Sequence, residues 1–349
     1  MVSSMALFTE GVFMPSVNKP KVYLVGTGGT ISSIGAARMD YTNYSYMSNK
    51  LPIDEMLARV PETGGIADVR AEQFLNLGSP DVTPDHWLQL AKRINQVFRD
   101  DPEAAGVVVT HGTATLEETA YFLNLTVKSS KPVVVTGAMR PPSSLGTDAD
   151  VILIDAIRVA AASHSAGRGV LTILNNQIQA ARDVTKTNSF RVETFQSIDF
   201  GFLGYADSDK EVVFYRTPDR AHTNNTEFDI DNVERMPRVD VPFAYAGADG
   251  TVIRALVEAG VNGLVAAGLG SGGSPPLFME ALKEVSDSGL PVVIATHTGS
   301  GRVMLTRRFT ETGYIVADNL APKKARILLM LALTVTSDKS DIQRMMLTY

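Results

Sequence analysis

Short apolar, β-branched runs recur along the chain, and each one ends in a turn rich in glycine or threonine. Over the first half of the chain these runs are KVYLVGTGGT, GVVVTHGT, PVVVTGAMR and GVLTILNN. Between them, apolar residues recur at helical spacing over Asp85 to Phe98, Leu116 to Val127 and Asp148 to Ala162. Strands of this kind that alternate with helices are typical of a parallel sheet covered by helices on both faces. We therefore expect an α/β fold.

A polar stretch after Thr217 divides the chain. The sequence PDRAHTNNTEFDIDNVERMP has no apolar periodicity, which predicts a linker over residues 218–238. Beyond it the strand-then-turn pattern returns on a smaller scale in VDVPFAYAG, GLVAAGLGSGG and PVVIATHTG. A chain of 349 residues is long enough for two cores. We expect a disordered leader at 1–18, a larger N-terminal parallel-sheet domain at 19–217 and a smaller C-terminal α/β domain at 239–349.

The charge balance excludes some classes of partner. The chain has 32 basic and 38 acidic residues and a formal net charge of -6, so it has no long-range attraction for nucleic acid or anionic membranes. The apolar run at Ile327 to Val335 is too short to span a bilayer. The absence of cysteine excludes disulfides, thiolate nucleophiles and Cys-based metal sites. The first residues lack the features of a secretion signal. We expect a cytoplasmic protein without metal or cofactor.

The turns that follow the apolar runs are the candidate sites, because ligands of open α/β sheets bind beyond the carboxyl ends of the strands. In VGTGGTIS, three glycines precede Thr30. Glycine permits positive φ angles and close approach of backbone N–H groups, which form an oxyanion hole for acyl transfer. Ile31 rules out a dinucleotide fingerprint, and the turn lacks the Lys of a P-loop. The alternative is a tight turn with a structural role.

Two further turns carry polar side chains. THGTAT contains His111, which we expect to be a structural residue because no neighbouring carboxylate orients it. Glu117 and Glu118 are explained by the helix start that they occupy. The third turn, TGAMRPPSSLGTDAD, is a long loop in which Arg140 fits either a structural anchor or a ligand contact.

Four long motifs resemble the bacterial-type L-asparaginase and glutaminase-asparaginase family. They are GTGGTIS, THGTATLEETAYFLNLTVKSSKPVVVTGAMRPPSS, ARDVTKTN and ARILLMLAL, and the likeness extends from about Lys21 to Tyr349. The resemblance implies an amidohydrolase fold of two α/β domains and a small-molecule substrate. It also implies a homotetramer built as a dimer of dimers, with active sites where the N-terminal domain of one subunit meets the C-terminal domain of its partner.

The resemblance assigns roles residue by residue. It implies that Thr30 is the nucleophile and that Thr113 is the second threonine of the site. It implies that Ser79 in NLGSPD holds the α-carboxylate of the substrate. Gly29 and Gly112, which precede the two threonines, are expected to contact the substrate as well.

The family also has a tyrosine in a mobile loop that covers and activates the nucleophile. Counting back 15 positions from the Val60-Pro61 landmark reaches Tyr46, and Tyr44 is the alternative. Without the family, MDYTNYSYMSN would be interpreted as a tyrosine-rich surface loop.

Several positions depart from the family pattern. The aspartate that holds the substrate's α-ammonium group is replaced by Ala114, and the Gln or Glu after the carboxylate-binding serine is replaced by Pro80. The partner subunit's asparagine in AGxGNG corresponds to Ser271, and the acidic residue of the later partner loop has only Glu311 as a neighbouring candidate. An ammonium group without its carboxylates is poorly bound, because a buried charge needs a partner. These changes favour a substrate that has no α-ammonium.

The lysine that the family pairs with its second threonine also looks altered. Counting back five positions from Arg168 gives Ser163, with His164 as a neighbour that could replace the lysine. Loss of such a group weakens proton delivery to a leaving amine, a role that contributes about 10²–10⁴-fold in rate. We therefore expect a threonine-nucleophile hydrolase that forms an acyl-enzyme with a small lactone, thiolactone or non-amino-acid amide. The alternatives are a plain L-asparaginase or glutaminase, and an inactive binding or sensor protein.

Overall fold

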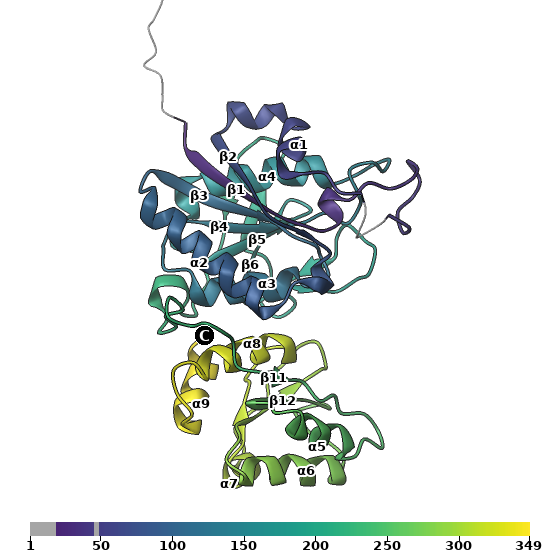
Figure 1. The fold of residues 1–349 in the computed structure, drawn as a ribbon, viewed down its shortest axis with the longest axis vertical. Helices are drawn as coiled ribbons and strands as arrows, with labels where there is room; N and C mark the ends of the chain where they lie inside the picture. The colour runs from purple at the N-terminus through teal and green to yellow at the C-terminus, as the bar shows by residue number, and fades with distance from the viewer. Residues whose placement is uncertain (1–18, 45–48) are drawn as a thin grey trace, which may run out of the picture.

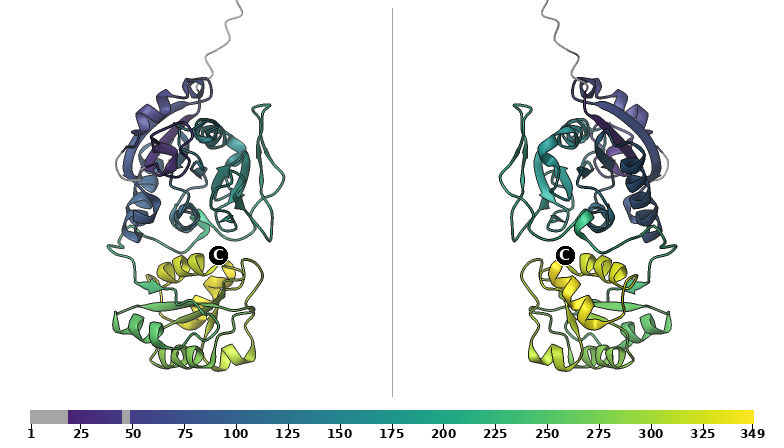
Figure 2. Two further views of the ribbon diagram at one scale, coloured as in Figure 1. Left: turned by 90° about the vertical axis from the view of Figure 1, so that its right-hand side faces the viewer. Right: turned by 90° about the vertical axis from the view of Figure 1, so that its left-hand side faces the viewer.

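The structure is a computed structural model that describes residues 19–44 and 49–349, and its two domains lie one above the other (Figures 1 and 2). The predicted leader at 1–18 and the predicted lid residue Tyr46 lie outside the described residues. The C-terminus of the chain lies between the two domains (Figure 2). The two-domain α/β expectation is confirmed, whereas the domain bounds 19–217 and 239–349 stay a prediction.

The N-terminal domain contains an eight-stranded sheet in the order β10-β9-β6-β5-β4-β3-β1-β2. Its strands, in chain order, are β1 (Lys21–Gly28), β2 (Asp68–Leu77), β3 (Ala104–Thr110), β4 (Val133–Thr136), β5 (Val170–Leu174), β6 (Gln177–Ala180), β9 (Gly204–Ala206) and β10 (Val212–Phe214). The strands from β5 to β2 run parallel, and β6, β9 and β10 run antiparallel.

The sheet is therefore mixed: the expected parallel strands form its larger part, and β6, β9 and β10 add an antiparallel edge that was not expected. The chain turns back after β5 through Asn175 and Asn176, whose φ angles are 50° and 63°. Two consecutive residues with positive φ are typical of the type I′ turn that joins antiparallel strands. Asparagine tolerates this conformation because its side chain hydrogen-bonds locally.

Helices cover both faces of this sheet (Figure 1). On one face lie α2 (Pro84–Asp100) and α3 (Leu116–Thr126), and on the other lie α1 (Ile53–Ala58) and α4 (Ala149–Ala161). Because both faces are covered, the central strands are buried throughout, as in β4, where all four residues are inaccessible. Helix α2 begins with a capping box in which the Thr83 side chain accepts the backbone N–H of His86.

The smaller C-terminal domain contains a four-stranded parallel sheet in the order β11-β12-β13-β14. Its elements are β11 (Val239–Asp240), α5 (Thr251–Glu258), β12 (Gly263–Gly268), α6 (Pro276–Asp287), β13 (Val292–Thr296), α7 (Arg307–Glu311), β14 (Ile315–Val316), α8 (Pro322–Ala332) and α9 (Lys339–Thr348). Helix α8 lies on the side that faces the N-terminal domain, and α5 and α6 lie on the outer side (Figure 1).

A single apolar cluster extends across both domains. It joins the buried face of α8 to the core of the larger sheet and α3. Phe228 and Ile230 are fully buried in the same cluster, so the segment predicted as a polar linker is packed against the domains along part of its length. The two domains are therefore joined by packing as well as by the chain.

The strand order places a ligand crevice at the ends of β1 and β3. From β1 the chain crosses to β2 on one side, and β3 then pairs with β1 on the other side. At such a switch point the connections leave the sheet in opposite directions, which opens a crevice outside the carboxyl ends of the two strands. Thr30 follows β1 and Thr113 follows β3, so both residues stand where the strand order predicts a ligand site.

A substitution at Gly29 tests how tightly the turns after β1 and β3 are packed against each other. Its φ of 90° and ψ of -171° suit only glycine, and a Cβ there would lie 2.2 Å from the Cα of Gly112. We expect Gly29→Ala to lower the free energy of unfolding by about 3 kcal/mol. Gly64→Ala is the control, because a Cβ at Gly64 meets no atom within 4 Å. Equal urea midpoints for the two variants would contradict the packing argument.

Candidate active site

Backbone contacts bring three turns of the N-terminal domain together. The N–H of Gly29 after β1 donates to the carbonyl of Leu77 at the end of β2, at 2.9 Å. Gly29 packs on Gly112 after β3, and a Cβ at Gly112 would lie 2.7 Å from the side chain of Ser79. Glycine allows this closeness because it has no side chain. The arrangement gathers Thr30, Thr113 and Ser79, as the sequence predicts.

Thr30 is buried and has a tyrosine as its hydroxyl partner. Only 4% of the residue is exposed, and its Oγ1 lies 3.0 Å from the hydroxyl oxygen of Tyr44. Tyr44 is the alternative that the sequence left open; Tyr46 lies outside the described residues, so the choice between the two stays a prediction. A hydroxyl becomes a nucleophile when a neighbouring group accepts its proton, and the Tyr44 oxygen is placed to do so.

Thr113 is paired with a lysine that the sequence argument overlooked. The Nζ of Lys186 donates a hydrogen bond to Thr113 Oγ1 at 2.7 Å. Lys186 belongs to β7 (Thr185–Lys186), which pairs with β8 (Phe195–Gln196) in a separate two-stranded ribbon. The prediction that the family lysine is lost was therefore wrong.

Ser163 and His164, which counting back from Arg168 had suggested for the lysine position, have other surroundings. Ser163 begins a short 3-10 helix, and His164 Nε2 hydrogen-bonds the carbonyl of Val212 at 2.6 Å. The His164 ring also packs edge-on against Phe214 of β10. His164 is thus engaged with the edge strand and does not replace the lysine.

The ammonium group of Lys186 is partly removed from water and faces a buried carboxylate. Burial lowers the pKa of Lys186 below the usual value of a lysine, and the Glu117 carboxylate opposes this shift. Glu117 Oε1 also accepts the backbone N–H of Lys186 at 3.0 Å. Glu117 stands in the first turn of α3, four positions after Thr113. One carboxylate therefore fixes the backbone of Lys186 and favours its charged form.

Ala114 contributes its backbone to the site. Its N–H donates to Ser79 Oγ at 3.2 Å, and Thr115 Oγ1 donates to the Ser79 carbonyl at 2.8 Å. Because Ser79 Oγ accepts this bond, its own proton remains able to reach a ligand. Pro80 follows in a 3-10 helix. Neither Ala114 nor Pro80 supplies a carboxylate to a bound cation.

His111 and Arg140 have structural roles. The two ring nitrogens of His111 contact the Gly112 carbonyl at 2.8 Å and Thr119 Oγ1 at 2.9 Å. Burial lowers the pKa of His111 to about 4, so the ring is neutral. Arg140 donates to the carbonyl of Gly146 within its own loop. The expectation for His111 is confirmed, and Arg140 is a loop anchor.

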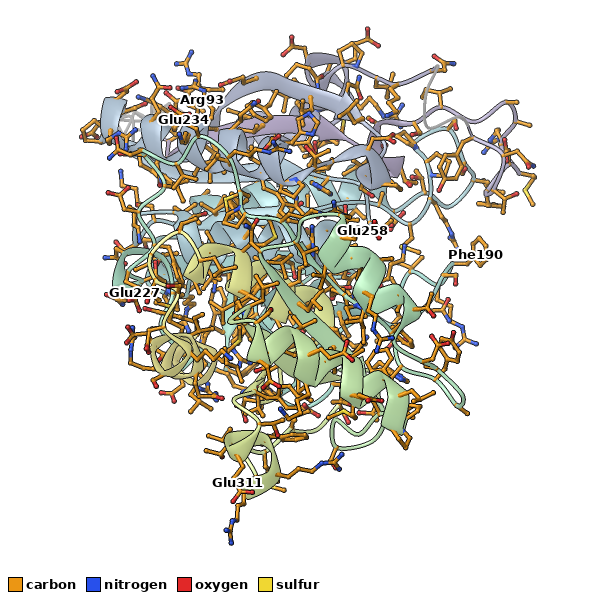
Figure 3. All side chains as sticks on the ribbon, turned by 60° about the horizontal axis from the view of Figure 1, so that its bottom comes forward. Arg93, Phe190, Glu227, Glu234, Glu258 and Glu311 are labelled. Carbon is orange, nitrogen blue, oxygen red and sulfur yellow. The ribbon has the colours of Figure 1, made fainter. Side chains whose placement is uncertain are left out.

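The two candidates from the C-terminal domain stand apart from Thr30 of their own chain. Ser271 is exposed in the turn after β12. Glu311 pairs with Arg307 of α7 at 2.6 Å, and it projects from the outer end of the domain (Figure 3). Their role in the site of a neighbouring subunit stays a prediction.

Residues 19–44 and 49–349 lack two features that other proteins have. None of the helices there is both long and apolar enough to cross a bilayer. Nor do those residues contain a group of three His, Cys, Asp or Glu side chains placed to hold a metal ion.

Comparison with known proteins decides the family. The domain described as Asparaginase, N-terminal, matches residues 21–220, and the Glutaminase/Asparaginase C-terminal domain matches residues 238–346. The chain belongs to the asparaginase family. It is 38% identical to L-asparaginase 2 of Escherichia coli over 99% of this chain and 98% of that protein. It is 37% identical to a glutaminase-asparaginase of Pseudomonas fluorescens over 94% of this chain and 90% of that protein.

A solved structure agrees with this asparaginase assignment. The crystal structure of a probable cytoplasmic L-asparaginase from Campylobacter jejuni superposes with a TM-score of 0.91 at 40% identity. The match covers 95% of this chain and all of that chain. The fold expected from the motifs is therefore shown.

Sequence reasoning on this asparaginase-family chain missed Lys186 and Glu117 for different reasons. Lys186 stands in the quoted motif ARDVTKTN, which carried the signal, but the count was made in the loop before β5. Glu117 was explained as a helix-start residue, which accounts for its position but not for its burial. A fully buried Glu in a first helical turn needs a partner, and only the folded chain shows which one it has.

Tyr44 is expected to accept the proton of Thr30 in this asparaginase-family protein. Tyr44→Phe should lower kcat for hydrolysis by about tenfold or more, because it removes the only group on the ring that can take the Thr30 proton. Tyr41→Phe is the matched control. Tyr41 lies three positions before Tyr44, but its hydroxyl donates to the carbonyl of Leu145 and not to Thr30. Steady-state kinetics at saturating substrate would check this. A large loss in Tyr46→Phe and none in Tyr44→Phe would contradict the assignment.

Glu117 is expected to set the pH range of activity. If protonated Lys186 delivers a proton through Thr113, kcat falls as pH rises through the Lys186 pKa. Removing the Glu117 charge removes an attraction that raises this pKa, so the pKa falls further. Glu117→Gln should therefore move the alkaline limb of kcat against pH to lower pH. A limb that stays in place, or moves upward, would contradict the coupling.

Proposed function

We propose that this asparaginase-family protein hydrolyses a small carboxamide and releases ammonia through an acyl-enzyme on Thr30. The observation that carries the proposal is the 2.7 Å hydrogen bond between Lys186 Nζ and Thr113 Oγ1, beside a buried Thr30 hydroxyl. A nucleophile and a separate proton donor are what amide hydrolysis requires, because the leaving nitrogen must be protonated.

The proposed steps use only groups of this chain. The Thr30 oxygen attacks the amide carbon while its proton passes to the Tyr44 oxygen, which releases its own phenolic proton to solvent in the same step. Thr113 protonates the leaving nitrogen and receives a proton from Lys186, so that the C–N bond breaks and ammonia departs. Water then attacks the Thr30 ester, and the acid is released. The retained lysine weakens the case for a lactone or thiolactone, which rested on its absence.

We propose that the preferred substrate is a monoamide of a four- or five-carbon dicarboxylic acid, without an α-ammonium group. Ser79 keeps a hydroxyl proton for the free carboxylate, and Ala114 and Pro80 offer no carboxylate to a cation. An ammonium left unpaired in a closed site is destabilised. The second candidate is asparagine or glutamine, which the names of the relatives favour: L-asparaginase 2 and glutaminase-asparaginase.

Ammonia release from a matched set of amides tests this function. Succinamate and asparagine differ only in the α-ammonium, as glutaramate and glutamine do. We expect kcat/KM for the compounds without ammonium to exceed that of the amino acids by about tenfold or more. A preference for asparagine would support the second candidate. A protein that binds these compounds and hydrolyses none of them, nor γ-butyrolactone or its thiolactone, would be an inactive binding or sensor protein.

Restoring a carboxylate at Ala114 should harm the native reaction. Ala114→Asp places a charge that a substrate without ammonium cannot pair, so kcat/KM for succinamate should fall by about tenfold to a hundredfold. Ala114→Asn is the control, since it has the same size without the charge. Activity on asparagine should stay low, because Pro80 still lacks the side chain of the family. Asparaginase activity typical of the family in Ala114→Asp would contradict the substrate proposal.

We also propose a homotetramer, built as a dimer of dimers, in which the dimer is the smallest active unit. A cleft of about 640 Å³ between the domains is lined by Ile198, Phe200 and Phe243, each of them exposed. Ser271 is exposed as well, and a second subunit would allow it to reach a neighbouring crevice. Native mass spectrometry and activity on dilution check this. A fully active monomer at nanomolar concentration would contradict it.

We propose a cytoplasmic location. The structural relative from Campylobacter jejuni is a probable cytoplasmic L-asparaginase, whereas a relative from Haemophilus influenzae, 39% identical, is a probable periplasmic one. Fractionation of cells that express the full chain would decide between the two compartments.

A further inference from the structure

Helix α8 begins with two lysines in an electrostatically unfavourable place. Lys323 and Lys324 follow Pro322 in the first turn. The N-terminus of a helix carries a partial positive charge, so cations there cost about 0.3–1 kcal/mol each. Lys324 is also almost completely buried, at 2% exposure. These side chains therefore need compensating contacts outside the helix.

Lys324 finds its contacts on the backbone that leads to Lys186. Its Nζ donates to the carbonyls of Ala181, Arg182 and Val184 at 2.9, 2.7 and 2.6 Å. All three protons of the ammonium group are used. The segment that it holds ends two residues before Lys186, and it belongs to the N-terminal domain, whereas Lys324 belongs to the C-terminal domain.

Lys323 contacts Glu117, the carboxylate partner of Lys186. Its Nζ donates to Glu117 Oε1 at 2.7 Å. That oxygen also accepts the backbone N–H of Lys186, as described above. Glu117 is fully buried, while the Lys323 side chain is 40% exposed. Helix α8 lies directly beside α3, which begins just after Thr113 (Figure 1).

We propose that the first turn of α8 is a clamp in which Lys323 and Lys324 hold the backbone of Lys186 so that its Nζ reaches Thr113. They are positioning residues, because Lys324 binds the carbonyls that precede Lys186 and Lys323 binds its carboxylate partner Glu117, and neither touches the reacting atoms. The inference rests on the proposed function, in which Lys186 supplies a proton through Thr113.

Burying the charge of Lys324 costs free energy, which its contacts to three carbonyls offset. Burial lowers the pKa of Lys324 to about 8, so charging this group in the folded protein is unfavourable. Near neutral pH the group is still charged, and the three carbonyls stabilise the charge. An apolar residue would fill this position without that desolvation penalty, but it would not bind the 181–184 backbone.

A double-mutant cycle between Lys324 and Lys186 tests the clamp. Lys324→Met keeps the length of the side chain and removes its three hydrogen bonds. We expect it to lower kcat by about tenfold to a hundredfold, because misplacing a catalytic group by 1 Å costs about that much. KM should change by less than about threefold, since no contact to substrate is lost. In the Lys186→Met background, Lys324→Met should change kcat by less than about twofold, because the group that it positions is gone.

Lys128→Met is the matched control. Lys128 Nζ also binds backbone carbonyls, those of Thr223 and Thr226, but it lies beyond the far end of α3. We expect kcat of this variant to stay within about twofold of the parent value, since it loses similar bonds away from the site. Thermal unfolding of each variant reports the loss of stability. If Lys324→Met does not fold, Lys323→Met replaces it in the same cycle, because its side chain is partly exposed.

The outcomes separate the clamp from the function. A crystal structure of Lys324→Met should show the Lys186 Nζ to Thr113 Oγ1 distance beyond hydrogen-bond range. An unchanged distance with unchanged kcat, or an equal loss of kcat in both backgrounds, would overturn the clamp alone. If Lys186→Met retains full kcat, the proposed proton transfer fails, and the measured distance in Lys324→Met then decides whether α8 holds Lys186.

Discussion

The carboxyl ends of β1, β2 and β3 approach so closely that the turn backbone itself fills the space between them. A side chain at Gly29 would overlap Gly112, and one at Gly112 would overlap Ser79. This contact fixes the relative positions of the residues that follow, Thr30 and Thr113. Since the strand order opens a crevice at the same place, the fold supplies both the opening and the rigid support for the hydroxyl groups.

The site also requires a partly buried cation, which is the ammonium group of Lys186. Residues of both domains contact Lys186 or the segment that precedes it. Lys186 comes from a short ribbon that has few backbone hydrogen bonds of its own. Glu117 of α3 accepts the backbone N–H of Lys186, and the first turn of α8 binds both Glu117 and the carbonyls just before the ribbon. The apolar cluster shared by α3 and α8 holds the two domains together. The C-terminal domain thereby bears on the chemistry of the N-terminal one within a single chain.

Local sequence predicted the central fold well. The strands β1, β3, β4 and β5 are continuous apolar runs rich in β-branched residues, as burial on both faces favours, and the first three end in Gly- or Thr-rich turns. The antiparallel edge was not predicted, because β9 and β10 have three residues each and show no periodicity. The Asn175-Asn176 turn was the available signal for the reversal of direction.

The site was predicted where residues are close in sequence to a strand end, as Thr30 and Thr113 are. It was predicted poorly where a loop of variable length intervenes. Counting across such a loop reached Ser163 where Lys186 is the lysine that contacts Thr113, and it left Tyr46 and Tyr44 as alternatives, since spacing in a loop is not fixed by hydrogen-bond geometry. The clamp residues of α8 were invisible to the sequence, because their partners lie more than a hundred positions away.

The central claim is that Thr30 is the residue that carries the acyl group. The most direct measurement is rapid acid quenching during turnover, followed by intact-mass and peptide mass spectrometry. The account predicts a mass increase equal to the acyl group of the substrate, located on the peptide that contains Thr30 and absent in Thr30→Ala. An acyl group on another side chain, Thr113 included, or undiminished turnover by Thr30→Ala would contradict it.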